Sequence, residues 1–85
     1  MDIHEKVKDL LISSFLGEEN RSELAYDTPL ISSGIMDSIT TLKVISDIER
    51  AFNIHFAPSE VDRENLDSID RIAKFINEKL KSTGG

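Results

Sequence analysis

The chain has 85 residues, of which 39% are apolar and 31% charged, and these values favour one globular domain with a small core. It contains no cysteine, which excludes disulfides, thiolate metal sites and a cysteine nucleophile. The net charge of -6 disfavours binding to nucleic acid or to anionic membranes. No stretch approaches the roughly 20 apolar residues of a membrane span, and the first residues lack the features of a signal peptide, so we expect a cytoplasmic monomer.

The first predicted element is a helix over residues 2–16, with Gly17 as its end. The segment from Gly17 to Asp37 is rich in turn-forming residues, so we predict a loop that Leu30, Ile31 and Ile35 anchor to the core. Such a long loop is uncommon in a compact domain and usually functional. The helix over residues 2–16 is predicted because apolar residues recur along it at spacings of three and four: Ile3, Val7, Leu10, Leu11 and Phe15.

The second predicted helix begins at Asp37 or Ser38 and ends near Phe52, with Asn53 as its cap. Residues 53–57 alternate polar and apolar but have no partner strand, so we predict an extended connector. Pro58 is typical of the first turn of a short helix, which we place at residues 59–61, followed by a loop over residues 62–67. The last predicted helix covers residues 68–81 and turns these residues to the interior: Ile69, Ile72, Ala73, Ile76 and Leu80.

The expected fold is therefore all-α: a small four-helix bundle with three long helices, one short helix and a long loop between the first two. Residues 1–81 are expected to form a single domain, and residues 82–85 a disordered tail. We expect no metal site, because neither His4 nor His55 has another ligand at a suitable spacing. We expect no catalytic residue either, since nothing in the sequence supplies a base for a serine nucleophile.

The tripeptide Asp-Ser-Ile occurs twice, at residues 37–39 and 67–69, each time before a segment with helical spacing. Aspartate is a preferred N-cap because its carboxylate accepts a hydrogen bond from an amide of the first turn, so both aspartates can start a helix. A serine just inside a helix start lies at the positive end of the helix dipole, which suits a covalently attached phosphate. These considerations do not choose between Ser38 and Ser68.

The helix after Ser38 has more apolar residues than one buried face requires. Ile39 and Leu42 lie beside the main stripe, together with Ser46. This second stripe indicates either a surface for partner proteins or a helix that is buried on a wide face. The main stripe, which suffices to bury one face, consists of Val44, Ile45, Ile48 and Phe52.

The segment around Ser38 has a recognisable pattern. It consists of a glycine, two variable residues and Asp-Ser-Ile, followed by a helix that ends in Glu-x-x-Phe. The positions that define the pattern are Gly34, Asp37, Ser38, Glu49 and Phe52. This pattern resembles the signature of the acyl carrier and peptidyl carrier proteins, which have leucine where this chain has Ile39. The resemblance covers nearly the whole chain, including the long first loop and the short third helix.

The resemblance implies that Ser38 carries 4′-phosphopantetheine, which a magnesium-dependent phosphopantetheinyl transferase installs from coenzyme A. The thiol of that arm would hold an acyl group as a thioester. The chain would thus be no enzyme but a substrate of a loading enzyme and of downstream synthases. Asp37 would cap the helix and help the transferase recognise the site, and Ile39 and Leu42 match positions that meet partner enzymes. Ser68 resembles only a helix start.

The cargo stays open because the second helix departs from the carriers of fatty acid synthesis. Lys43 and Arg50 balance Asp47 and Glu49, so the helix has no net charge. One alternative is therefore a carrier for another pathway, such as polyketide synthesis. Another is an aminoacyl or peptidyl carrier that is loaded by an adenylating enzyme, and the D-alanine carrier shares this architecture. The alternative from another class is an unmodified helical protein-interaction module.

Negative charge is concentrated in two other segments. Between Gly17 and Asp37, five acids against one arginine give a local charge of -4, and between Pro58 and Asp67 four acids against one arginine give -3. These two acidic segments either steer a basic partner toward the Ser38 end or form an ordinary solvated surface.

Overall fold

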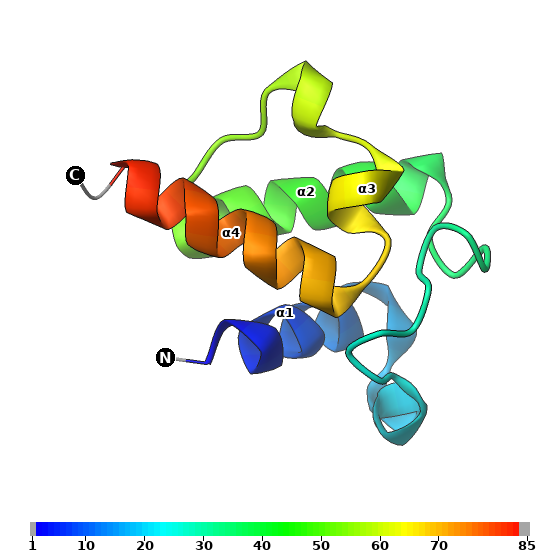
Figure 1. Ribbon diagram of the computed structural model, residues 1–85. Coiled ribbons are helices and arrows are strands. Elements are labelled where there is room, and N and C mark those ends of the chain that lie inside the picture. Colours follow the sequence, from blue (N-terminus) through cyan, green and yellow to red (C-terminus); the bar gives the residue numbers. More distant parts are fainter. Residues whose placement is uncertain (1, 84–85) are drawn as a thin grey trace.

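Four α-helices make up most of the computed structural model, which describes residues 2–83 (Figure 1). They are α1 (Ile3–Leu11), α2 (Ser38–Phe52), α3 (Arg63–Leu66) and α4 (Ile69–Thr83). A π-helical segment, Ile12–Leu16, extends α1, and two 3₁₀ helices cover Glu18–Glu23 and Pro58–Glu60. No strand occurs among the described residues, so the predicted all-α bundle of three long helices and a short one is confirmed.

The first helix begins and ends where the sequence predicted. The side chain of Asp2 caps α1 by accepting a hydrogen bond from the amide of Glu5 at 3.3 Å. The π-helical extension ends at Gly17, which has a φ of 85° and donates its amide to the carbonyl of Ile12 at 2.9 Å. A positive φ is easily adopted only by glycine, which explains why the helix stops at this residue.

The predicted loop between the first two long helices is only partly irregular, because Glu18–Glu23 is a 3₁₀ helix. Its sequence is polar throughout and shows no apolar periodicity that would have revealed it. Arg21 ties this helix to α1 through a 2.7 Å contact with Asp9. Leu30 is fully buried, as predicted, whereas Ile35 is 36% exposed and does not anchor the segment.

The second long helix has the predicted bounds. Asp37 caps α2, and Asn53 ends it in the left-handed conformation with a φ of 55°. Residues 54–57 are neither helix nor strand, which confirms the predicted connector.

The short helix predicted at residues 59–61 forms one residue earlier, and a second short helix was missed. The chain forms a 3₁₀ turn at Pro58–Glu60 and then α3 at Arg63–Leu66, within the stretch predicted as loop. Asp62 caps α3 by accepting a hydrogen bond from the amide of Asn65 at 2.9 Å, and Leu66 is only 1% exposed. One cap and one buried leucine suffice for a single turn, but they are too short a pattern for helical periodicity to reveal.

The last helix differs from its prediction at both ends. α4 continues to Thr83, two residues beyond the predicted end of the helix at residue 81, and Gly84 and Gly85 of the predicted tail lie outside the described residues. The cap of α4 is Ser68 rather than Asp67, because the hydroxyl of Ser68 accepts a hydrogen bond from the amide of Arg71 at 3.1 Å. Asp67 has a different task, described below.

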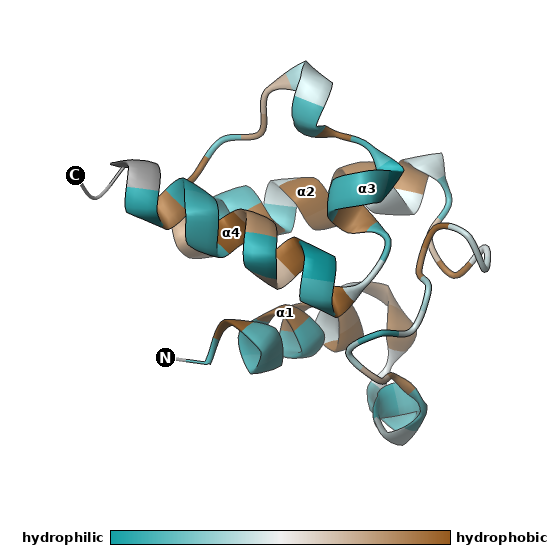
Figure 2. Cartoon of the chain, viewed as in Figure 1, coloured by the Kyte–Doolittle hydropathy of each residue, from teal (hydrophilic) through white to brown (hydrophobic). Residues whose placement is uncertain are grey.

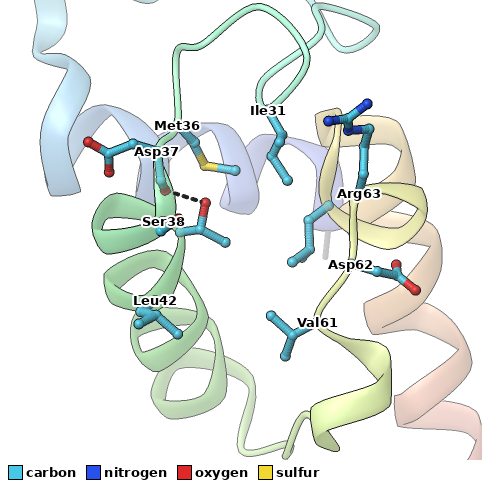
Figure 3. A pocket seen from close by; sticks show the side chains of 10 residues that line it. Ile31, Met36, Asp37, Ser38, Leu42, Val61, Asp62 and Arg63 are labelled. Carbon is cyan, nitrogen blue, oxygen red and sulfur yellow. Dashed lines mark hydrogen bonds between the residues drawn. The ribbon is translucent and has the colours of Figure 1, made fainter.

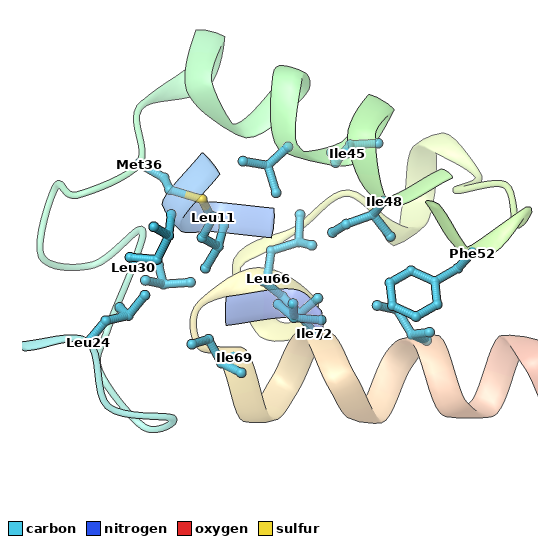
Figure 4. Close-up of a cluster of buried hydrophobic side chains, with 14 of the residues drawn as sticks. Leu11, Leu24, Leu30, Met36, Ile45, Ile48, Phe52, Leu66, Ile69 and Ile72 are labelled. Carbon is cyan, nitrogen blue, oxygen red and sulfur yellow. The ribbon is translucent and has the colours of Figure 1, made fainter. Parts of the chain in front are cut away.

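The apolar faces of the helices meet in one core (Figures 2 and 4). The main stripe predicted for α2 is buried, and Ile48 has no exposed surface at all. No helix among residues 2–83 has the length and apolar character required to cross a membrane. The buried cluster comprises Val7, Leu11, Ile12, Leu24, Leu30, Met36, Val44, Ile45, Ile48, Phe52, Ile54, Leu66, Ile69, Ile72 and Ile76.

Candidate functional site

The first copy of Asp-Ser-Ile forms the start of α2. Oδ1 of Asp37 accepts a hydrogen bond from the amide of Thr40 at 2.8 Å, and the hydroxyl of Thr41 donates to the carbonyl of Asp37 at 2.6 Å. The hydrogen bonds from the backbone and side chain of Thr40 lower the pKa of Asp37 below its ordinary value. Ser38 is the first residue of the helix and is exposed. Its hydroxyl thus lies in solvent at the positive end of a 15-residue helix.

The segment before Ser38 is a closed turn. The amide of Met36 donates to the carbonyl of Leu30 at 2.8 Å, and the amide of Gly34 donates to that of Ile31 at 3.1 Å. Gly34 has a φ of 87°, and a Cβ there would meet no atom within 4 Å, so its conformation and not the space requires glycine. Met36 is 2% exposed. This buried anchor fixes the chain immediately before the exposed Ser38.

A groove of about 490 Å³ opens beside Ser38, between the start of α2 and the chain around α3 (Figure 3). In Figure 3 the side chains of Ile31, Met36 and Val61 lie toward the gap between the two walls. Apolar side chains thus dominate the groove, and charged ones stand among them. The lining residues are Ile31, Met36, Asp37, Ser38, Thr41, Leu42, Val61, Asp62, Arg63 and Leu66.

The second apolar stripe of α2 lies on the surface. Ile39 is 81% exposed and Leu42 is 62% exposed. These values exclude a helix buried on a wide face, since the core uses the other stripe. Two large apolar side chains close to Ser38 are therefore exposed to solvent.

Most charged side chains of α2 are engaged within the molecule. Lys43 donates to the carbonyl of Ser14 at 2.8 Å, and the hydroxyl of Ser14 donates to the carboxylate of Asp47. The carboxylate of Glu49 accepts a hydrogen bond from the amide of Phe56 at 2.8 Å and so holds the connector against the end of the helix. Arg50 is exposed. Lys43, Asp47 and Glu49 thus each have a hydrogen-bond partner outside α2, and α2 itself carries no net charge.

The second copy of Asp-Ser-Ile is built differently. Ser68 is only 7% exposed, and its hydroxyl caps α4. Asp67 binds the turn that precedes Ser38, because its carboxylate accepts hydrogen bonds from the amides of Ile31 at 2.8 Å and Ser32 at 2.9 Å. The sequence carried no signal for this link, since 36 residues separate Asp67 from Ile31.

The two histidines do not form a site. The side chain of His55 is 97% exposed, and its Nδ1 lies 3.9 Å from Oε2 of Glu49. Nε2 of His4 lies 3.0 Å from the carboxylate of Asp70. Among the described residues, no group of three or more histidine or acidic side chains could hold a metal ion.

The arrangement around Ser38 fits a covalently attached arm with a phosphate at its base. The exposed hydroxyl offers a point of attachment, the helix start favours a negative phosphate, and the groove offers an apolar surface along which a flexible arm can lie. The residues at Ser68 do not fit such a group, because the hydroxyl there is buried and already bonded.

Comparison with known proteins agrees with this geometry. The family model described as "Phosphopantetheine attachment site" matches residues 5–76. The D-alanyl carrier protein of Lactococcus lactis subsp. cremoris (strain MG1363) is 35% identical over 75 residues, which cover 88% of this chain and 92% of that protein. The D-alanyl carrier protein of Streptococcus pyogenes serotype M5 (strain Manfredo) is 32% identical over 78 residues, or 92% of this chain and 95% of that protein. A buried helical core, an exposed serine at a helix start and these relatives lead to one conclusion: the chain belongs to the phosphopantetheine attachment site family of carrier proteins, whose members bear covalently attached 4′-phosphopantetheine.

Proposed function

We propose that Ser38 is the residue that bears 4′-phosphopantetheine. The observation that carries this proposal is the contrast between the two Asp-Ser-Ile sites, since Ser38 is exposed beside a groove while Ser68 is 7% exposed and bonded to a backbone amide. Ser38 Oγ would form a bond to the pantetheine-side phosphorus of the coenzyme A diphosphate. The P–O bond of the diphosphate breaks, adenosine 3′,5′-bisphosphate leaves, and the serine proton passes to a base of the transferase. The chain is then a substrate of its partner enzymes and not itself an enzyme.

The neighbouring residues have separate tasks in this proposal. Asp37 caps α2 and so fixes the direction in which Ser38 presents its hydroxyl. Ile39 and Leu42 are exposed next to it and would contact the transferase and the other partner enzymes. The attached arm supplies the thiol that the cysteine-free chain lacks. Because coenzyme A and its transferase act in the cytoplasm, the proposal places the protein there.

We further propose that the cargo is an amino acid, with D-alanine as the first candidate, loaded by an adenylating enzyme. Its support is the name shared by the relatives in Lactococcus and Streptococcus, which the chain matches over nearly their full length. The zero net charge of α2 also supports it, because an acidic helix would suit the basic docking patches of fatty acid enzymes better.

Incubation with coenzyme A, magnesium and a broad-specificity phosphopantetheinyl transferase tests the attachment site. We expect the intact mass to increase by one 4′-phosphopantetheine in the wild type and in Ser46→Ala, whose serine is exposed in the middle of α2. Ser38→Ala should show no increase. An unmodified wild type would favour a protein-interaction module, and a modified Ser38→Ala would place the attachment at another residue.

A loading assay tests the cargo. The modified protein is incubated with ATP and a D-alanine-activating ligase, and in parallel with L-alanine or with a malonyl-transferring enzyme and malonyl coenzyme A. We expect a mass increase of one alanyl group with D-alanine that hydroxylamine removes. Loading with malonate but not with D-alanine would refute the aminoacyl cargo while leaving Ser38 as the attachment site.

A further inference from the structure

We propose that Asp67 is a positioning residue for the modification of Ser38: it holds the closed turn of residues 30–36, and with it one wall of the groove, in the place that the transferase needs. The inference rests on the proposed function, because it concerns the same serine. Asp67 lies in the turn between α3 and α4 and is hydrogen-bonded to residues 30–32, so it acts on Ser38 through that turn.

The contacts of Asp67 are concentrated on one short stretch. Its backbone carbonyl accepts a hydrogen bond from the amide of Leu30 at 2.7 Å. Oδ1 accepts two, from the amides of Ile31 at 2.8 Å and Ser32 at 2.9 Å, and Oδ2 accepts one from the hydroxyl of Ser32 at 2.7 Å. Three successive amides thus end on one aspartate. The hydrogen bonds from Ser32 and Ile31 lower the pKa of Asp67 to about 2, so it is an anion at neutral pH.

The held stretch leads directly to Ser38. Leu30, whose amide Asp67 binds, is fully buried, and its carbonyl accepts the amide of Met36 at 2.8 Å. Met36 is followed by Asp37 and Ser38. The position of the segment before α2 therefore depends on where Leu30 is held. Asp67 binds Leu30 with its backbone carbonyl, and it binds Ile31 and Ser32 with its carboxylate.

Asp67 also joins the two walls of the groove. Ile31 lines the groove from the turn, and Leu66, the residue before Asp67, lines it from α3. The hydrogen bond from the amide of Ile31 to Asp67 therefore connects one wall to the other. Without this carboxylate, two amides and a hydroxyl lose their acceptor, and the turn has to find new partners in water. The turn would then sample several positions, and a transferase would meet Ser38 in its productive position less often.

Three variants separate this role from a general loss of stability. Asp67→Ala removes all three side-chain hydrogen bonds, whereas Asp67→Asn keeps an oxygen for the two amides. Asp2→Ala is the matched control, because it removes the cap of α1 and leaves the groove untouched. The first readout is kcat/KM for phosphopantetheinyl transfer from coenzyme A, at a temperature where all variants are folded by circular dichroism. The second is amide hydrogen exchange of Ile31, Ser32 and Met36.

We expect kcat/KM to fall about tenfold or more in Asp67→Ala and by about threefold or less in Asp67→Asn, in the range that small misplacements of a reacting group produce. The three amides should exchange faster in Asp67→Ala, while Asp2→Ala changes neither readout at these residues. An unchanged kcat/KM in Asp67→Ala would overturn the inference, and so would an equal fall in Asp2→Ala. The proposed function fails separately, if the wild-type protein itself is not modified at Ser38.

Discussion

The two serines of the repeated tripeptide should respond in opposite ways to replacement by alanine. Ser68→Ala removes the hydroxyl that accepts the amide of Arg71 at 3.1 Å, in a place where Ser68 is 7% exposed and water replaces the lost partner poorly. Ser38→Ala removes a hydroxyl that is exposed at the surface. We therefore expect Ser68→Ala to affect stability and leave modification intact, and Ser38→Ala to do the reverse.

The magnitude follows from the loss of a helix cap. Replacing a serine cap by alanine costs about 1 kcal/mol, within a range of roughly 0.5 to 2. A loss of about 1 kcal/mol corresponds to a fall in Tm of roughly 4 to 8 °C for a domain of this size. An exposed serine without such a task changes the free energy of unfolding by less than about 0.5 kcal/mol.

Urea unfolding of the unmodified protein, followed by far-UV circular dichroism, measures both variants against the wild type. The m-values should agree within error, so that a shift in midpoint reports stability alone. The reasoning would be refuted if Ser38→Ala lost as much stability as Ser68→Ala, or if Ser68→Ala accepted no phosphopantetheine while folded.

Further outcomes follow from single residues. The pKa of Asp67 is lowered from 3.8 to about 2, so the stability that its carboxylate contributes is complete above about pH 4 and is lost as the pH falls toward 2. The urea midpoint of Asp67→Asn should therefore depend less on pH in that window than the midpoint of the wild type. Parallel pH profiles of the two proteins would contradict this. Ile48→Ala should lower the free energy of unfolding in urea by about 2 to 5 kcal/mol, because Ile48 is fully buried. Leu42→Ala should lower it by less than about 0.5 kcal/mol, because Leu42 is 62% exposed. Similar losses in the two variants would mean that the second stripe is not on the surface. Gly17→Ala should lower Tm by an amount equivalent to about 1 kcal/mol or more, because alanine resists a φ of 85°, and an unchanged Tm would speak against that conformation.

The long helices could be predicted because each one repeats an apolar residue every three or four positions. The two apolar stripes of α2 were found from spacing alone, but the spacing left open whether Ile39 and Leu42 are exposed, and the tertiary structure decides that they are. The cap at Asp37 was also predictable, since it depends on residues close in sequence.

Features that depend on contacts distant in sequence could not be predicted. Local rules gave Asp37 and Asp67 the same task, because both precede Ser-Ile and a helix. The tertiary structure assigns them different ones, since the turn at residues 30–32 offers three donors to Asp67 and the hydroxyl of Ser68 is left to cap α4. The 3₁₀ helix at Glu18–Glu23 and α3 were missed because neither has a repeating pattern long enough to detect.

The link between the π-helical segment and α2 through Ser14 has a consequence for how partners recognise α2. Lys43 and Asp47 both bind Ser14, one through its carbonyl and the other through its hydroxyl, so both side chains are directed toward Ser14 and away from Ile39 and Leu42 as contact groups for an enzyme. Exposed charges attract partners over distances that dissolved ions screen, whereas apolar contacts are insensitive to such screening. The contacts of Ile39 and Leu42 should therefore persist as ionic strength rises, so that any salt dependence of a complex reports charged side chains, such as those of the two acidic segments, rather than this apolar pair.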